Sequence, residues 1–187
     1  MARADQLLAS YRRHVSLTPR INLPLSQRVW FIVYPPEDER RMVNRIPEFE
    51  IATREHGLDW QHLDLTGVFA DWMDTYDPDE RTKILAEPRI TQKYATKGLT
   101  ALVSNRVRTA MQSVPSERAD GTVLALSGLM DLYDFTQVSA ALETVEKLRL
   151  RGILALFFPG EREGNTYRFL GARDGWNYLA TPILTEG

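Results

Sequence analysis

Four short apolar runs, separated by longer stretches with helical spacing, constrain the fold more than any other feature of the sequence. The runs at 27–34, 121–128 and 151–158 are almost continuously apolar, which is typical of strands covered on both faces. Along the run at 59–66, Trp60, His62 and Asp64 alternate with Gln61, Leu63 and Leu65, which predicts a half-buried strand. Because strands alternate with helices, we expect an α/β, three-layer Rossmann-like sandwich with a mainly parallel sheet and right-handed crossovers.

The stretches between these runs carry apolar residues at helical spacing. The N-terminal sequence MARADQLLASYRRH predicts an amphipathic helix, and Glu37, Asp38 and Glu39 open another helix with acids that suit the positive end of its dipole. Gly57 is suited to end that helix, and Pro47 is expected to kink or divide it because proline has no N–H to donate. Further helices are predicted at 67–76, 79–86, 88–114 and 136–148.

Two segments depart from simple alternation of strands and helices. The segment 67–114 is long for one crossover, so we expect an all-helical insertion within a single domain that covers 1–187. Near the C-terminus, Asp174 and Gly175 lie between two aromatic-rich stretches, a pattern that predicts a hairpin. The chain is therefore expected to finish with an antiparallel edge strand from about Trp176 to Pro182.

The composition limits the classes of chemistry that are open to the chain. It has 187 residues, 43% of them hydrophobic and 26% charged, and it contains no cysteine. Disulfides, thiol nucleophiles and thiolate-bound metals are therefore excluded. The longest apolar runs are far shorter than the roughly 20 residues that cross a bilayer, and the N-terminal sequence lacks the apolar stretch of a signal peptide. We expect a cytoplasmic protein with no membrane contact.

The net charge of −2 conceals a segregated distribution. Residues 1–36 hold five arginines against one aspartate, residues 37–81 hold thirteen acids against five arginines, and residues 89–118 hold six bases against one glutamate. Such blocks favour oppositely charged faces that orient charged partners. The bases of the predicted long helix could contact nucleic acid, although a pI near 6.0 favours an ordinary solvated face. These bases are Arg89, Lys93, Lys97, Arg106 and Arg108.

The predicted carboxyl ends of the strands, where ligands of open parallel sheets usually bind, contain no complete catalytic or nucleotide motif. The sequence has no phosphate-binding loop, and Pro35 and Pro36 remove two amide donors after the first strand. Ser127 follows a strand but lacks the glycine two positions earlier that a nucleophile elbow requires. None of the histidines is paired at a metal-ligand spacing; they are His14, His56 and His62.

Four acids after the predicted strands leave two interpretations open. Asp38, Asp64, Asp131 and Glu161 could converge at the carboxyl edge of the sheet and bind magnesium. Acids in this position are also routine N-caps of helices, and we favour that interpretation. We therefore predict a protein that is not an enzyme, with no catalytic residues, no metal site and no cofactor.

The densest group of aromatic, arginine and asparagine residues lies in the C-terminal stretch 157–180. These residue types are enriched at interface hot spots, because planar groups bury much area at little entropic cost. They could equally stack bases, or form a structural hairpin in which Trp176 and Tyr178 fill the core. We predict a partner-binding surface formed by Glu161, Asn165, Tyr167, Arg168, Arg173, Asp174, Trp176, Asn177 and Tyr178.

The same stretch, FFPG-E-x-x-x-N-x-Y-R-x-L-x-A-R-D-G-W-N-Y-L-A from Phe157 to Ala180, resembles the signature of BrxB, a small component of bacterial BREX bacteriophage-exclusion systems. The similarity extends from the first predicted helix to Pro182 and is weakest over 74–120. Segments of the N-terminal half that are similar to this family are RVWFIVY (28–34), EDERR (37–41), EFEIATRE (48–55) and Asp64-Leu65-Thr66 with Phe69 and Trp72.

The resemblance implies a cytoplasmic protein encoded beside a large ATPase, an adenine-specific DNA methyltransferase and PglZ, a phosphatase-superfamily protein. It also implies a component that antiviral defence requires and that has no assigned catalytic motif. We therefore expect a non-enzymatic adaptor that binds PglZ and helps to assemble the complex, with any contact to DNA indirect. The alternative is a Rossmann-like nucleic-acid or nucleotide-binding module of the same complex, which would use the basic helix and the carboxylates beyond the strands.

Overall fold

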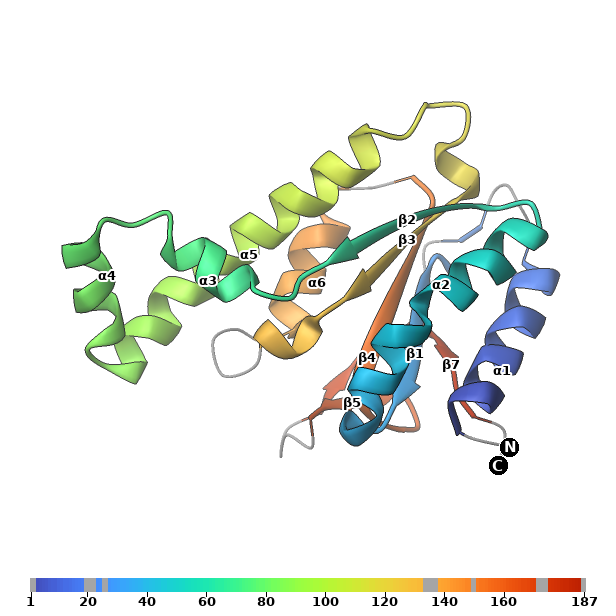
Figure 1. Cartoon of the computed structure of the whole chain (residues 1–187), viewed down its shortest axis with the longest axis horizontal. Coiled ribbons are helices and arrows are strands. Elements are labelled where there is room, and N and C mark those ends of the chain that lie inside the picture. The colour runs from blue at the N-terminus through green and yellow to red at the C-terminus, as the bar shows by residue number, and fades with distance from the viewer. Residues whose placement is uncertain are drawn as a thin grey trace. The chain divides into compact units, whose positions relative to one another are not determined.

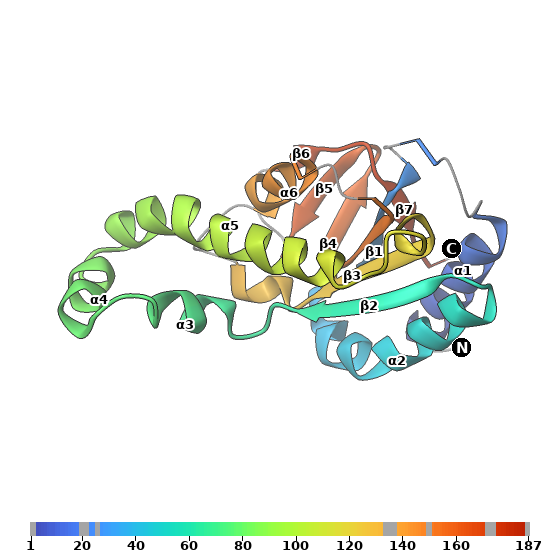
Figure 2. The ribbon, with the colours of Figure 1, turned by 90° about the horizontal axis from the view of Figure 1, so that it is seen from above.

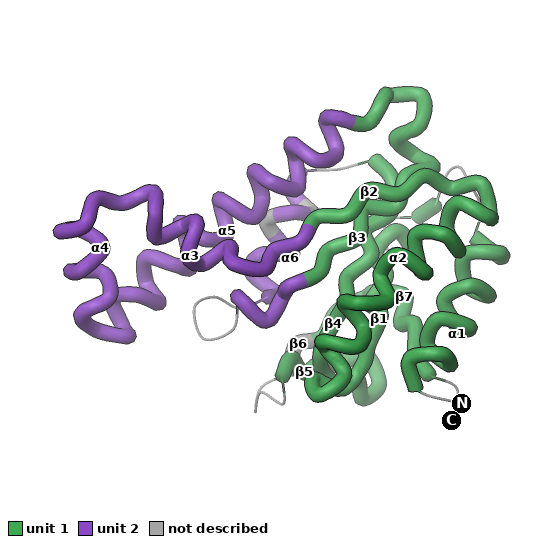
Figure 3. Tube along the Cα trace, in the orientation of Figure 1, with its two compact units in different colours: residues 1–63, 114–127, 151–187 green, residues 64–113, 128–150 purple. Residues whose placement is uncertain are grey.

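The computed structural model describes residues 3–18, 23–24, 27–132, 138–148, 151–170 and 175–185. The chain divides into two compact units, which Figure 3 shows in different colours. Unit 1 contains residues 1–63, 114–127 and 151–187, and unit 2 contains residues 64–113 and 128–150. Neither unit is a continuous stretch of chain.

Unit 1 contains a sheet and two helices, α1 (Arg3–Leu17) and α2 (Glu39–Glu55), as Figure 1 shows. The main path of the sheet has the strand order β2-β3-β4-β1-β7. The strands are β1 (Val29–Tyr34), β2 (Asp59–Asp64, ending at the first residue of unit 2), β3 (Thr122–Ser127), β4 (Ile153–Glu163), β5 (Thr166–Phe169), β6 (Trp176–Asn177) and β7 (Thr181–Ile183). Two short 3₁₀ helices, η2 (Pro36–Asp38) and η3 (Ala119–Gly121), precede α2 and β3.

The central strands of unit 1 pair in parallel. β4 lies between β1 and β3, with Leu156 opposite Phe31 of β1 and Ala155 opposite Ala125 of β3. Every residue of β1 and β3 is buried, as expected of strands that are covered on both faces. The predicted α/β class with a mainly parallel sheet is therefore confirmed.

Helices α1 and α2 cover one face of this sheet (Figure 2). Trp30 of β1 and Phe157 of β4 point to this face and belong to the same core as Tyr11 of α1 and Phe49 of α2. The rings of Tyr11 and Phe49 lie 4.9 Å apart, and the Tyr11 hydroxyl is 2.6 Å from the hydroxyl of Thr53. Because each fully buried large side chain contributes roughly 1.5–3 kcal/mol, this core fixes both helices to the sheet.

Helix α2 is continuous, so of the two predicted effects of Pro47, a kink or a division, the division does not occur. Proline cannot donate to the carbonyl of Val43, and the helix loses that one hydrogen bond. Pro47 is exposed, so water can reach the site of the missing bond. Burial of Met42 and Ile46 before the proline, and of Phe49 after it, holds both halves of the helix to the core.

Unit 2 is built from helices, as expected for the insertion at 67–114. Its elements are α3 (Val68–Met73), α4 (Pro78–Leu85), α5 (Pro88–Gln112), the 3₁₀ helix η4 (Leu129–Leu132) and α6 (Val138–Glu146). The Thr91 hydroxyl donates to the carbonyl of Ile84 over 2.7 Å, which ties α5 to the end of α4. Gly98 lets α3 approach α5, because a Cβ at this position would lie 2.5 Å from Nε1 of Trp72.

The C-terminal region contains the antiparallel pairing that the sequence predicts around Asp174 and Gly175. Strand β6 pairs with β5 in antiparallel orientation across the segment that contains these two residues, and Gly164 and Asn165 join β4 to β5 in a second antiparallel pairing. The prediction of an antiparallel edge strand over 176–182 is confirmed for Trp176 and Asn177 and wrong for its end, because β7 joins the edge of the sheet in parallel with β1. The side chain of Ile183 belongs to the core that α1 and α2 cover. Packing against these distant segments sets the parallel pairing of β7. Asp174 lies outside the described residues.

Candidate functional site

Five aromatic rings form a cluster on the face of the sheet that Trp30 does not occupy. Phe31 stacks on Phe158 and on Tyr178, with centroid separations of 5.2 Å and 5.4 Å. Tyr167 meets Phe31 edge-on at 4.5 Å, and Phe169 lies 5.4 Å from Phe158. Successive side chains of a strand point to opposite faces, so Phe31 points away from the core under α1 and α2. This aromatic cluster fixes β5 and the residue that follows β6 to the sheet.

Strand β4 continues past the aromatic cluster as one arm of the hairpin with β5. Gly160 pairs with Phe169, and a Cβ on Gly160 would lie 2.1 Å from the carbonyl oxygen of Arg168. Only glycine permits this approach of the two backbones. At the turn, Gly164 adopts a φ of +58°, which other residues rarely adopt. The hairpin geometry is therefore specified by two glycines, one at each end of its paired region.

The hairpin carries polar side chains above the aromatic cluster. Among the predicted partner-binding residues, the polar side chains on β4, β5, their turn and β6 that are at least partly exposed are here termed the hairpin surface; they are Glu161, Asn165, Arg168 and Asn177. The Tyr178 amide donates to the carbonyl of Asn165 over 3.1 Å, which joins the turn to the residue that follows β6. A guanidinium nitrogen of Arg168 lies 3.2 Å from a carboxylate oxygen of Glu163. Four of the residues predicted to bind a partner are thus brought together on one hairpin and its neighbouring strand.

The other predicted partner-binding residues differ in position. Tyr167 is buried in the aromatic cluster and does not present its ring to a partner; burial raises the pKa of its hydroxyl, and the nearby Arg162 guanidinium opposes that rise. Tyr178 is partly exposed and covers Phe31. Trp176 lies in β6, but its side chain is outside the described residues. Arg173 and Asp174 also lie outside the described residues.

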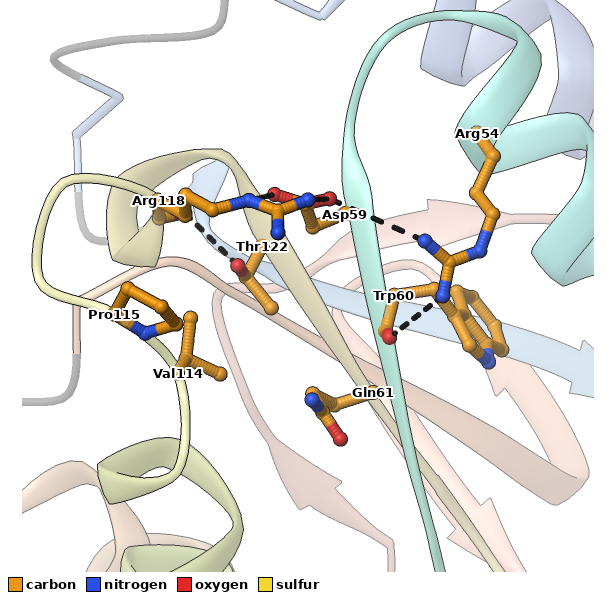
Figure 4. A pocket seen from close by; sticks show the side chains of 8 residues that line it. All are labelled: Arg54, Asp59, Trp60, Gln61, Val114, Pro115, Arg118 and Thr122. Carbon is orange, nitrogen blue, oxygen red and sulfur yellow. Dashed lines mark hydrogen bonds and ion pairs between the residues drawn. The ribbon is translucent and has the colours of Figure 1, made fainter.

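A pocket lies beside the amino-terminal ends of β2 and β3 in unit 1 (Figure 4). Its lining residues are Arg54, Asp59, Trp60, Gln61, Val114, Pro115, Arg118 and Thr122. Arg118 holds both carboxylate oxygens of Asp59, with Nε donating over 2.8 Å, and a guanidinium nitrogen of Arg54 lies 4.0 Å from the same carboxylate. Arg54 also donates from Nε to Glu50 over 2.8 Å. The positive charge of the pocket is thus matched by acids of the same unit.

The position of this pocket does not favour catalysis. Strand β2 begins at Asp59 and β3 begins at Thr122, so the pocket lies at the amino ends of these strands. Ligands of open α/β sheets usually bind at the opposite, carboxyl ends. No sequence motif indicates this pocket, and Arg118 is noticeable in the sequence only as one of the bases in the segment 89–118.

At the carboxyl end of β1, Asp38 is buried and ion-paired. Its carboxylate lies 3.0 Å from a guanidinium nitrogen of Arg41 and 3.5 Å from one of Arg3. Asp38 precedes α2, but its side chain makes no capping hydrogen bond to that helix. The favoured interpretation as an N-cap is therefore wrong for this residue, because two arginines compete for the carboxylate.

Two of the other acids bind backbone amides of the loop that precedes α3 in unit 2. Asp64 accepts a hydrogen bond from the N–H of Thr66 over 2.9 Å, and Asp131 accepts one from the N–H of Gly67 over 2.5 Å. These bonds agree with the interpretation that such acids satisfy amides at helix starts. Within the described parts of the chain, no three His, Asp or Glu residues are grouped to hold a metal ion. Glu161 is exposed on the hairpin surface.

The structure brings together one polar pair that no sequence spacing suggests. His62 Nε2 of β2 and Ser127 Oγ of β3 are hydrogen-bonded at 2.8 Å, although they are 65 positions apart. Ser127 is fully buried, so its hydroxyl is not open to a substrate. The remaining histidines pack against their own surroundings: His56 Nδ1 lies 2.8 Å from the carbonyl of Ala52, and His14 meets the ring of Trp30 edge-on at 4.6 Å.

The predicted nucleic-acid contacts on α5 fall into two groups. Three of them are exposed and lie four residues apart; these three, here termed the basic row, are Arg89, Lys93 and Lys97. The other two interact with neighbours in unit 2. Arg106 forms an ion pair with Asp71 at 2.6 Å, and the exposed Arg108 donates to Asn105 Oδ1 over 3.0 Å. The basic row is therefore the part of this helix that is open to a ligand.

Comparisons with protein-family models, with curated proteins and with solved structures find no match to this chain. In the described part of the chain, no helix has the length and apolar character needed to cross a bilayer. Three features of the chain therefore bear on its function: the hairpin surface, the basic row and the resemblance carried by the C-terminal motif.

Proposed function

We propose that this chain is a non-enzymatic adaptor that binds a PglZ-like protein and helps to assemble a BREX-type defence complex against bacteriophages. The expected neighbours in the complex are the large ATPase and the DNA methyltransferase that the resemblance implies. The C-terminal motif from Phe157 to Ala180, which resembles BrxB, supports this proposal from the sequence. The hairpin surface supports it from the structure.

The observation that carries the proposal is the way in which motif residues are divided between the interior and the surface of one hairpin. Phe158 and Tyr167 are buried in the aromatic cluster. Glu161 and Asn165 are exposed on the same hairpin, and Arg168 is half-buried. A motif that served only the core would not require specific polar residues on the outside, because exposed positions tolerate most substitutions.

The hairpin surface has the physical properties of a binding surface that is formed before the partner arrives. The aromatic cluster beneath it and the pairing of β5 with both β4 and β6 restrict its backbone, so little conformational entropy remains to be lost on binding. Arginine and asparagine side chains can make several hydrogen bonds each, which gives specificity at a polar interface. Glu161 and Arg168 add charges of opposite sign, which fix the orientation of a partner more than they increase affinity.

The direct test is co-expression with the PglZ-like protein encoded in the same operon, followed by size-exclusion chromatography at low and at physiological salt. The proposal predicts that both proteins elute together at each salt concentration. Separate elution of two folded proteins under both conditions contradicts it.

A charge reversal tests whether the hairpin surface is the interface. Arg168→Glu is expected to weaken the complex at least about ten-fold, because it would place a negative charge beside Glu163 and opposite the groups that bind arginine. The matched control is Arg12→Glu, which breaks a surface ion pair with Glu55 on α2 and should leave binding unchanged. Equal affinity of both variants, measured by isothermal titration calorimetry, would place the interface elsewhere on the chain.

A further inference from the structure

The basic row on α5 is a set of neighbouring positive charges without matching acids. At least ten arginines that the structure describes form ion pairs with carboxylates. Arg89, Lys93 and Lys97 form none with any described residue, and α5 contains no acid over its 25 residues. The nearest acid in the sequence is Glu87, which precedes the helix and makes no capping hydrogen bond.

This arrangement is unfavourable for the isolated helix. Like charges four residues apart on a helix repel each other, and the row contains two such pairs. Arg89 also lies in the first turn of α5, where the helix dipole favours acids over bases. A bound polyanion would relieve both effects.

An exposed aromatic ring accompanies the row. Tyr94 follows Lys93 directly, and it lies three positions before Lys97, on the same side of the helix. The residue is 49% exposed and makes no hydrogen bond or ring contact with any described residue. Ile90, one turn earlier, is 36% exposed and extends the apolar surface beside the ring. A free aromatic face next to a row of cations can stack an unpaired base whose phosphates bind the cations.

We propose that the basic row and Tyr94 form a binding site for single-stranded nucleic acid. Successive cations are separated by about 6 Å along the helix axis, so they can follow the phosphates of a flexible strand. A duplex keeps its bases stacked on one another and offers none to the ring. A second copy of the chain would bring two positive rows together, and an acidic protein segment would leave the ring without a base to stack. The site is independent of the adaptor role, because the full chain alone should bind the strand.

The test measures the fluorescence anisotropy of a labelled oligothymidylate of about 15 nucleotides, at about 50 mM salt, with the full chain. Three phosphate contacts predict a slope of about −2 in the plot of log affinity against log salt concentration, since each contact on a single strand contributes about −0.7. Absence of binding at protein concentrations of about 100 μM, the weak end of non-specific affinities, would overturn the proposal.

A pair of matched double variants tests the location of the site. Lys93→Glu/Lys97→Glu removes two contacts and should lower affinity at least about ten-fold and reduce the slope to about −0.7. Arg40→Glu/Lys147→Glu changes the net charge equally at exposed bases that form no ion pair with described residues, and it should change affinity less than about two-fold. Equal loss in both variants would overturn the proposal. Lys93→Gln/Lys97→Gln repeats the test without new acids if the first variant fails to fold.

A third variant tests the ring. Tyr94→Leu keeps apolar bulk but cannot stack a base, so it should weaken binding by about ten-fold while the salt slope stays unchanged. Duplex DNA should bind more weakly than the single strand, and polyglutamate should compete poorly. If polyglutamate competes as well as the oligonucleotide and Tyr94→Leu has no effect, the row binds an acidic protein and the proposal is wrong. Equal affinity for duplex and single strand would likewise overturn it.

Discussion

The two long helices, α2 in unit 1 and α5 in unit 2, differ in how their charges are used. The sequence of α2 has four arginines and four glutamates, and three of its arginines form ion pairs with acids of unit 1. The sequence of α5 has five bases and no acid, and among described residues only Arg106 has an ion-pair partner. Charge in α2 therefore contributes to the packing of its own unit, whereas the basic row remains available to a ligand. Substitutions at packed positions of unit 1 should change stability, and substitutions in the basic row should change the binding of nucleic acid.

The largest effect is expected at the hairpin of unit 1. Gly160→Ala would place a Cβ 2.1 Å from the carbonyl oxygen of Arg168, so β4 and β5 must separate and the aromatic cluster must shift. We expect a loss of about 3 kcal/mol in the free energy of unfolding, measured by urea denaturation. Gly121→Ala is the control, because its Cβ would meet no atom within 4 Å. Similar stabilities of the two variants would show that the hairpin does not constrain unit 1.

A smaller effect is expected from one hydroxyl in the core under α1 and α2. Tyr11→Phe removes the 2.6 Å hydrogen bond to Thr53 but keeps the ring against Phe49. It should cost about 1 kcal/mol in urea denaturation, the usual value for one buried hydrogen bond. Tyr94→Phe removes an exposed hydroxyl from α5 and should leave stability unchanged. An equal loss in the free energy of unfolding for Tyr11→Phe and Tyr94→Phe would contradict the view that Tyr11 serves packing in unit 1 and Tyr94 does not in unit 2.

A pH-dependent effect of lower magnitude is expected at His14 of α1. Burial against Trp30 lowers the pKa of this imidazole below its ordinary value of about 6.5. The unfolded chain then binds more protons than the folded chain, so stability falls as pH decreases below about 6.5 and is retained above it. His14→Phe keeps a ring on Trp30 but cannot titrate. The stability of the wild type relative to this variant should therefore be lower at pH 5.5 than at pH 7.5; a constant difference would refute the assignment.

The smallest effect on stability is expected in the basic row. Lys93→Gln relieves the like-charge pairs with Arg89 and Lys97, so the free energy of unfolding should stay constant or rise by a few tenths of a kcal/mol at most. If this substitution clearly destabilises unit 2, the basic row makes structural contacts. The charges of α5 would then contribute to packing as those of α2 do. Thermal melts at low salt, where repulsion is least screened, give the clearest measurement.

The sequence was most informative where burial is continuous and least informative where distant segments meet. The apolar runs located β1, β2 and β3 to within two residues at each end, because buried strands need apolar side chains whatever their neighbours are. Pro47 does not divide α2, because a helix held by Met42, Ile46 and Phe49 tolerates one missing hydrogen bond. The predicted antiparallel edge strand holds for β6 but not for β7, because the three residues of β7 carry too little pattern to specify parallel or antiparallel pairing.

For the candidate sites, the residue types could be predicted from the sequence. Which side chains are exposed and which already have a partner could not. The C-terminal motif indicated a polar and aromatic surface, but burial separated Tyr167 from Glu161 and Asn165. Likewise, five bases of α5 looked equivalent until Asp71 was found to bind Arg106. The hydrogen-bonded pair of His62 and Ser127 and the ion pair of Asp59 and Arg118 left no local signal, because each joins residues that are distant in the sequence.

The sequence by itself determined the α/β class, the helical insertion, the segregation of charge and the absence of any chemistry that depends on cysteine. These properties follow from local patterns and from composition, which require no knowledge of partners in space. Only the tertiary structure decided which side chains are exposed, which cations are already paired and which strand β7 joins. Those properties depend on contacts between residues that are far apart in the chain, and such contacts form only when both segments are folded.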